Sequence, residues 1–368
     1  MKTILKINSL LTFLLISTLS CKTIDIKSDL TTINHNNKEI TYEGRIGKSF
    51  NNSASEIYWS GTSIKLNFNG TFVKVILEDE NGSNYFNVIL DGTNFELLKL
   101  NKGKQEYILA KNLPKGNHSI ELIKRNEWTY GKTLFYNFEV KGKLLDKDPE
   151  KKLFIEFYGD SVTTGHGNED YSGDDKPEGN VTNNYYTYAA MTARNFNAAY
   201  SCIARGGIGI MVSWFNMIMP EMYDRLNPND ANSKWDFTSK QPDIVVINLL
   251  QNDSWIVNYP DNKEFKRRFG NQKPSKEKIV LDYSNFIKTI RAKYNNASII
   301  CLLGNMDITK EGSTWPNYVE KAINELNDLN IYTCIVPYKD SPDHPKVKEH
   351  EIIAKKLTTL IKNKLINN

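Results

Sequence analysis

The sequence predicts two domains, an all-β sandwich followed by an α/β domain with a parallel sheet. Three observations support this fold class. Residues 41–142 contain short runs in which apolar and polar residues alternate, separated by turns that contain glycine. From residue 150 to residue 368, apolar runs alternate instead with segments whose apolar residues recur every three to four positions. The chain of 368 residues is also long enough to bury two separate cores.

The first 21 residues are predicted to be a targeting segment. Two lysines precede an apolar stretch over residues 10–19, which ends in Ser20 and Cys21. This stretch is too short for an ordinary membrane-spanning helix, and a small residue before a cysteine resembles a bacterial lipobox. We therefore expect export, with Cys21 lipidated in the outer membrane or at the cell surface. A plain secretory signal, which would give a periplasmic or secreted protein, is the alternative.

Residues 22–40 are mostly polar, show no periodicity and are expected to be a tether. Residues 41–142 follow as the sandwich. In a run such as Val73, Val75 and Leu77, apolar residues occupy every second position, so they share one face of a strand. Glycine-containing turns at short intervals favour a jelly-roll-like sandwich of about 100 residues.

The α/β domain is predicted over residues 150–368. Apolar residues three or four positions apart indicate helices over about residues 279–294 and 346–364. Strands and helices in alternation predict a parallel sheet with helices on both faces. Active sites in such sheets lie at the carboxyl ends of the strands. The candidate strands are residues 153–158, 198–203, 244–250, 299–303 and 331–336.

Four short motifs follow these strands or precede the last helix. They are Gly159-Asp160-Ser161, the glycine cluster over residues 205–209, Gln251-Asn252-Asp253, and His344-Pro345. A serine hydroxyl is a poor nucleophile until a base takes its proton and donors stabilise the resulting oxyanion. Histidine is suited to proton transfer near neutral pH, and backbone or amide N–H groups are suitable donors.

In this order, the four motifs resemble those of the SGNH (GDSL-type) hydrolases. The preceding sandwich narrows the resemblance to carbohydrate esterase family two, whose members remove acetyl groups from plant polysaccharides. Sandwich segments that carry it include Tyr58-Trp59-Ser60-Gly61 and residues 88–92 and 116–127. The resemblance covers most of residues 41–365. It implies an SGNH-type three-layer domain after the sandwich.

The resemblance also assigns roles to individual residues. Ser161 corresponds to the nucleophile and His344 to the general base. The backbone N–H groups of Ser161 and Gly207 correspond to oxyanion donors, together with the side-chain amide of Asn252. Gly206 or Gly209 remains an alternative to Gly207 within the glycine cluster.

The sequence departs from the family pattern at two places. Leu250 stands where a glycine usually precedes Asn252 by two residues. An aspartate usually precedes the catalytic histidine by two or three residues, and here neither position holds one. Asp343, directly beside His344, is therefore a candidate to orient the imidazole. The alternative is a serine–histidine dyad in which a backbone carbonyl holds the ring.

The resemblance implies an exported serine esterase that releases acetyl groups from a polysaccharide or oligosaccharide, as acetyl xylan esterases do, without metal or cofactor. Trp214, Trp255 and Trp315 are candidates to stack on sugar rings, and membership of the core is the alternative for each. An SGNH lipase, a thioesterase or a peptidoglycan deacetylase keeps the chemistry with another substrate. A non-catalytic glycan-binding lipoprotein is the rival of another class.

Charge and cysteine content remove other classes of function. The formal net charge is only +4, and no basic stripe with interleaved aromatic residues supports nucleic-acid binding. The spacing of the four cysteines matches no metal site. A membrane is therefore expected as a partner only through the lipid on Cys21.

Overall fold

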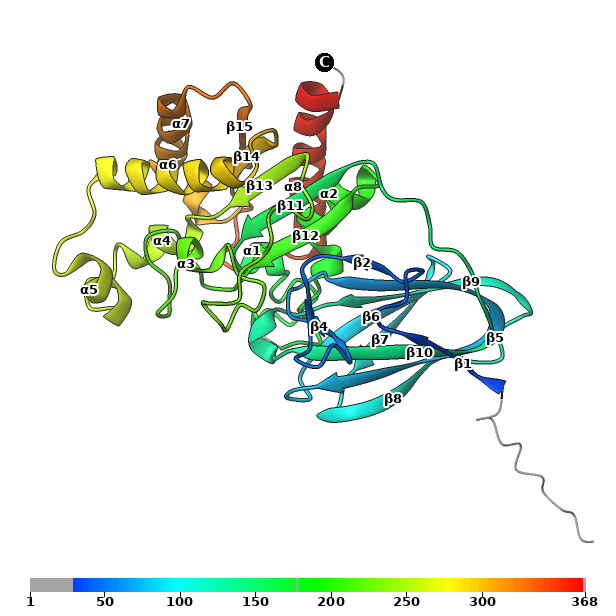
Figure 1. Ribbon diagram of the computed structural model, residues 1–368. Helices are drawn as coiled ribbons and strands as arrows, with labels where there is room; N and C mark the ends of the chain where they lie inside the picture. Colours follow the sequence, from blue (N-terminus) through cyan, green and yellow to red (C-terminus); the bar gives the residue numbers. More distant parts are fainter. Residues whose placement is uncertain (1–28, 177, 367–368) are drawn as a thin grey trace, which may run out of the picture.

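The computed structural model describes residues 29–176 and 178–366, and it contains two domains packed side by side (Figure 1). The first is an antiparallel β-sandwich, and the second is built on a five-stranded parallel sheet. Both domains and their order confirm the predicted fold class. The sandwich consists of β1 (Thr31–Asn34), β2 (Thr41–Glu43), β3 (Ile46–Lys48), β4 (Ser55–Ile57), β5 (Ser63–Asp79), β6 (Tyr85–Leu90), β7 (Asn94–Lys99), β8 (Gly103–Ala110), β9 (Gly116–Lys124) and β10 (Thr133–Leu144).

The long strand β5 organises the sandwich. Its 17 residues pair with β10, β9, β8 and β2, all antiparallel. Val73, Val75 and Leu77 on one face of β5 are fully buried, because alternate side chains of a strand point to the same side. The predicted alternation therefore supplies the sandwich core.

The prediction that residues 22–40 form a tether is wrong for residues 31–34, which belong to the sandwich. Residues 31–34 form β1, which pairs with β10 through Thr31 and Val140. Ile33 is buried in the sandwich core, and a single apolar side chain in a polar run gives no periodicity that sequence analysis can detect. The sandwich therefore extends from residue 31 to residue 144. The targeting segment, Cys21 and the first half of the tether lie outside the described residues.

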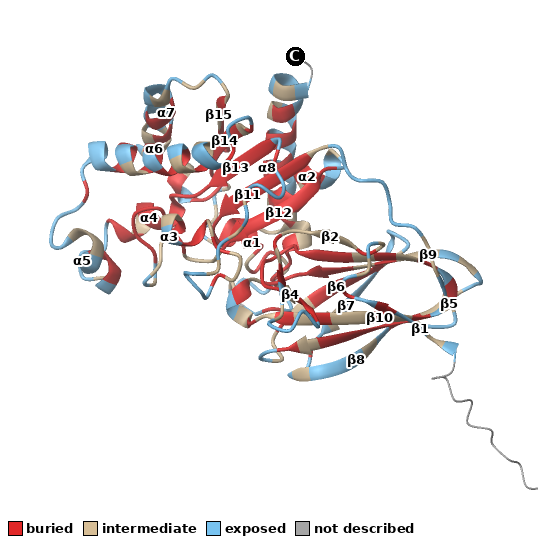
Figure 2. Ribbon diagram, in the orientation of Figure 1, coloured by how far each residue is buried: buried red, intermediate tan, exposed pale blue. Residues whose placement is uncertain are grey.

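All five predicted strands form the parallel sheet, in the order β12-β11-β13-β14-β15. Figure 2 shows these strands buried along most of their length, because helices cover both faces. β11 pairs with β12 on one side and β13 on the other, so the motifs that follow these three strands meet at one edge. The strands are β11 (Phe154–Gly159), β12 (Ala199–Ala204), β13 (Ile244–Asn248), β14 (Ser298–Leu303) and β15 (Ile331–Ile335).

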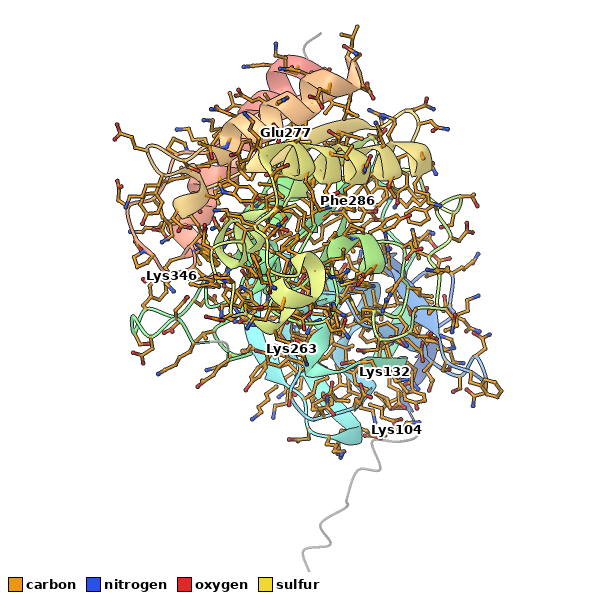
Figure 3. All side chains as sticks on the ribbon, turned by 90° about the vertical axis from the view of Figure 1, so that its left-hand side faces the viewer. Lys104, Lys132, Lys263, Glu277, Phe286 and Lys346 are labelled. Atoms are coloured by element: carbon orange, nitrogen blue, oxygen red, sulfur yellow. The ribbon has the colours of Figure 1, made fainter. Side chains whose placement is uncertain are left out.

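Helices α6 and α7 pack on one face of this sheet, and α2 and α8 pack on the other (Figure 1). Phe286 belongs to α6, and its side chain is buried in the hydrophobic core that this helix covers (Figure 3). The helices are α1 (Ser161–Thr164), α2 (Tyr188–Asn195), α3 (Met219–Met222), α4 (Gln251–Ile256), α5 (Lys263–Phe269), α6 (Lys276–Lys293), α7 (Trp315–Leu326) and α8 (Val347–Ile361), with short 3₁₀ turns η2 (Trp128–Tyr130), η3 (Asn184–Tyr186) and η4 (Asp307–Thr309) and a final π-helical turn η5 (Lys362–Ile366).

A buried ion pair joins the two domains. Arg45 of the sandwich donates hydrogen bonds to the backbone carbonyls of Tyr223 (2.7 Å) and Arg225 (2.9 Å) in the α/β domain. Its guanidinium also lies 3.3 Å from the carboxylate of Glu156 on β11, and both side chains are almost completely buried. Because a buried charge is costly unless it is paired, this contact holds the domains in one arrangement.

Two further observations concern the described part of the chain. None of its helices is long and apolar enough to cross a membrane. The cysteines at positions 202, 301 and 334 are buried and unpaired, as expected for small apolar side chains of the sheet.

Candidate active site

The motifs after β11, β12 and β13 meet at the carboxyl edge of the parallel sheet. Gly159 is the last residue of β11, and this position has no room for a side chain because an added Cβ would lie 1.9 Å from Thr163 Oγ1. Asp160 then caps α1 by accepting a hydrogen bond from the N–H of Val162 at 3.0 Å. Ser161 is the first residue of α1 and follows the end of β11 by two positions. Here the predicted strand–turn–serine geometry is present.

The structure brings Ser161 and His344 together, although 183 positions separate them. His344 Nε2 lies 2.8 Å from Ser161 Oγ. The other ring nitrogen, Nδ1, lies 2.6 Å from a carboxylate oxygen of Asp175. Serine, imidazole and carboxylate thus form a continuous hydrogen-bonded chain, in which the carboxylate fixes the tautomer that leaves Nε2 free to accept the serine proton.

Asp175 holds His344 at more than one point. Its carboxylate also accepts the backbone N–H of His344, at 3.3 and 3.4 Å, and lies 3.4 Å from Lys346 Nζ. Burial alone would raise the pKa of Asp175, but the hydrogen bond from His344 and the charges of His344 and Lys346 lower this pKa well below its ordinary value. The carboxylate of Asp175 is therefore ionised near neutral pH.

The orienting carboxylate is Asp175, which sequence analysis missed. The hydrogen bonds of the described residues include none between Asp343 and the ring of His344, and none in which that ring donates to a backbone carbonyl. Neither the adjacent aspartate nor the carbonyl-held dyad is what the structure contains. Asp175 belongs to an irregular polar loop between α1 and η3, where several acidic residues stand in no recognisable motif. Only the chain fold distinguishes it from its neighbours.

Gly207 is the glycine of its cluster with a free amide. The N–H of Gly206 donates to Glu127 at 2.6 Å, and the N–H of Gly209 donates to Ser213 Oγ at 2.9 Å. In the described part of the chain, no hydrogen bond uses the N–H of Gly207. Its φ of 80° lies in the left-handed region that favours glycine. Of the three glycines in this cluster, Gly207 is therefore the one whose N–H is available to an oxyanion.

Asn252 lies at the start of α4, beside Asp160 and the glycine cluster. Its Nδ2 donates to the carbonyl of Ile208 at 2.9 Å and makes only a long contact, 3.4 Å, with Asp160. An oxyanion would therefore have to replace Asp160 as the acceptor of this long hydrogen bond. Leu250, where the family pattern has glycine, adopts a left-handed φ of 83°. Its buried side chain belongs to the hydrophobic core, which offsets the strain of that conformation.

Asp253, the acidic residue that follows Asn252, has a structural role in the loop that carries Gly207. Its carboxylate accepts hydrogen bonds of 2.7–3.1 Å from the backbone N–H groups of Ile210, Met211 and Val212. Burial raises the pKa of Asp253 to about 6, and these three N–H groups oppose the rise. The residue therefore fixes the loop that carries Gly207 rather than taking part in proton transfer.

A cavity of about 300 Å³ lies at the boundary between the domains and is lined in part by Gly206, where an added Cβ would lie 3.6 Å from Ser161 Cβ. Glu127, Thr129 and Tyr130 line it from the sandwich, and His166 lies on the opposite, α/β side. The His166 ring packs against that of His344, with centroids 4.5 Å apart. Burial, followed by the charge of His344, lowers the pKa of His166 to about 4, so His166 stays neutral near pH 7.

The three candidate tryptophans differ in position. Trp214 is 45% exposed, and its indole N–H donates to Asn252 Oδ1 at 3.0 Å. The indole N–H of Trp255 is instead held by Asp307. Trp315, at the start of α7, packs on Tyr318 and the core. Trp214 is thus the tryptophan that is hydrogen-bonded to a residue of the candidate site.

The arrangement is suited to acyl transfer. A serine, a histidine and a carboxylate are hydrogen-bonded in line, and the free N–H of Gly207 and the amide of Asn252 lie nearby. Within the described residues, no group of three or more His, Cys, Asp or Glu side chains could hold a metal ion.

Comparison with known proteins agrees with this geometry. Residues 42–149 match the family model described as carbohydrate esterase 2 N-terminal. The cellulase/esterase CelE of Acetivibrio thermocellus is 33% identical over 349 residues, which are 92% of this chain but only 41% of that protein. An acetylxylan esterase / glucomannan deacetylase of Cellvibrio japonicus is 23% identical over 348 residues, 91% of this chain and 92% of that protein.

A solved structure extends the likeness over both domains. It is a family two carbohydrate esterase from Clostridium thermocellum in complex with cellohexaose. The two chains are 32% identical and superpose with a TM-score of 0.79, and the match covers 89% of this chain and 99% of that one.

Proposed function

The chain belongs to carbohydrate esterase family two, an SGNH-type family, and on this premise we propose that it is a serine esterase that removes acetyl groups from polysaccharides or oligosaccharides. The observation that carries the proposal is the hydrogen-bonded array of Ser161, His344 and Asp175, with distances of 2.8 and 2.6 Å. Curated relatives named as acetylxylan esterases support the substrate class.

The proposed reaction proceeds in two steps. Ser161 Oγ attacks the acetyl carbonyl carbon while His344 Nε2 takes its proton, and the N–H groups of Ser161, Gly207 and Asn252 stabilise the oxyanion. The sugar oxygen leaves as an alcohol with the proton from His344. Water then attacks the acetyl-serine, again giving its proton to His344, and acetate departs as Ser161 regains the hydrogen. The charge of Asp175 stabilises the imidazolium in both steps.

The polar site favours this substrate over the alternatives. A lipase or thioesterase binds a long acyl chain, which prefers an apolar groove, whereas the cavity between the domains is lined by a carboxylate, hydroxyl groups and an imidazole. Desolvating that carboxylate against an alkyl chain would be costly. The continuous array of hydrogen bonds argues against a non-catalytic glycan-binding protein, because nothing in simple binding requires it.

Acetate release from a panel of acetylated glycans by the purified protein tests the proposal. We expect release from acetylated xylan, glucomannan or cello-oligosaccharides, and its loss in Ser161→Ala. Ser254→Ala, which alters a buried serine of α4, is the matched control and should stay active. Wild-type protein that releases no acetate from any ester, or a Ser161→Ala variant with full activity, would overturn the mechanism.

A further inference from the structure

The sandwich places a carboxylate at the catalytic serine. Glu127 lies between β9 and η2, and its Oε2 accepts the backbone N–H of Gly206 at 2.6 Å. A Cβ added to Gly206 would lie 3.3 Å from Glu127 Oε2 and 3.6 Å from Ser161 Cβ. Glu127 and the nucleophile therefore flank the same glycine, although they belong to different domains.

Hydrogen bonds from buried side chains of the sandwich fix the loop that carries Glu127. The buried Nζ of Lys124 donates to the backbone carbonyls of Asn126 (2.8 Å) and Glu127 (3.1 Å). The Asn126 side chain in turn accepts the N–H of Tyr85 and donates to the carbonyl of Ser83. A lysine placed in the interior to hold two carbonyls is an expensive support, which indicates that the position of this loop matters.

Glu127 has acceptor capacity to spare. Oε2 accepts from Gly206, and Oε1 accepts the hydroxyl of Thr129 at 2.5 Å. A carboxylate offers about four lone-pair positions, and Glu127 is only half-buried. Glu127 lines the cavity of about 300 Å³ together with Thr129, Tyr130 and His166, and this volume is at the small end of ligand sites.

We propose that this cavity between the domains is a sugar subsite, in which Glu127 accepts a hydrogen bond from a hydroxyl of the substrate. The inference rests on the proposed function and deepens it. Sugar hydroxyls are donors, and a carboxylate acceptor fixed near Ser161 selects the sugar orientation that presents an ester to the serine. The sandwich therefore takes part in choosing which acetylated hydroxyl reacts.

The test compares two substrates in the full chain. Glu127→Gln keeps an oxygen for the N–H of Gly206 but replaces the charged acceptor that faces Thr129 and the cavity with an amide. Charge-assisted hydrogen bonds contribute about 1.5–3 kcal/mol, so kcat/KM on acetylated xylo- or cello-oligosaccharides should fall roughly 10- to 150-fold. An aryl acetate, which has no sugar hydroxyl, should be hydrolysed within about twofold of the wild-type rate.

Glu80→Gln, the same change at an exposed sandwich carboxylate, is the matched control and should leave both substrates unaffected. Equal loss on both substrates in Glu127→Gln would show that Glu127 only supports the glycine loop, and no loss on either would show that it contacts no substrate. Both results reject the subsite. Wild-type protein that is inactive on every acetylated glycan would instead reject the proposed function itself.

Discussion

Replacing Asp175 is the perturbation that separates a triad from a dyad. In the proposed mechanism His344 carries a positive charge whenever it holds the serine proton. Two unit charges about 4 Å apart attract by about 4 kcal/mol at an effective dielectric constant of ~20. The side chains of His344 and Asp175 are 17% and 28% exposed, so solvent reduces this attraction, and we take about 3 kcal/mol. That value corresponds to a roughly 100-fold loss of kcat.

The assay is the kcat for an aryl acetate at pH 7, measured for Asp175→Ala and Asp175→Asn. Asparagine tolerates the left-handed backbone, φ 51°, of residue 175, so the second variant tests charge without disturbing the loop. Asp343→Ala is the matched control and should stay within about threefold of the wild type. If Asp343→Ala loses as much activity as Asp175→Ala, or if both Asp175 variants keep more than about a third of wild-type kcat, the reasoning is refuted.

Four further predictions concern Asn252, Arg45, His350 and Cys21. Asn252→Ala should lower kcat on an aryl acetate about 100- to 1000-fold, the usual effect of one lost oxyanion donor, and a loss below about tenfold would contradict that role. Arg45→Met leaves Glu156 buried without its cation and should lower the free energy of unfolding by about 3–5 kcal/mol; a change below about 1 kcal/mol in urea unfolding would argue against the ion pair. Burial lowers the pKa of His350 to about 3 in the folded chain, and the charge of His344 adds to this effect. Below about pH 6.5 the His350 imidazole therefore takes up a proton in the unfolded chain but stays neutral in the folded chain. Acidification from pH 7 to pH 5 should therefore cost about 2 kcal/mol of stability through this residue, and urea unfolding of His350→Asn with an unchanged pH slope would refute it. Cys21 is predicted to be the lipidated first residue of the mature protein, which mass spectrometry of the native N-terminus checks; an unmodified terminus elsewhere would exclude the lipid anchor but not export.

The sequence alone determined the elements whose physics is local. Apolar residues at every second position predicted several strands of the sandwich, such as the one with Val73, Val75 and Leu77, and the alternation of apolar runs with helical periodicity predicted all five parallel strands in their order along the chain. Side-chain direction in a strand or helix repeats every two or 3.6 residues, so these patterns survive without knowledge of the fold. Parallel strands also share one carboxyl edge, and this is why Ser161, Gly207 and Asn252 could be grouped from sequence.

Only the tertiary structure decided which side chains complete the site. Asp175 reaches His344 across 169 positions, and Glu127 reaches Gly206 across 79. Neither stands in a periodic run, and a carboxylate in a polar loop looks the same in sequence whether it faces solvent or an imidazole. The same applies to Ile33, whose burial makes β1 a strand instead of a tether. Such contacts depend on how loops from distant parts of the chain are brought together, and no local pattern of residues encodes that distance.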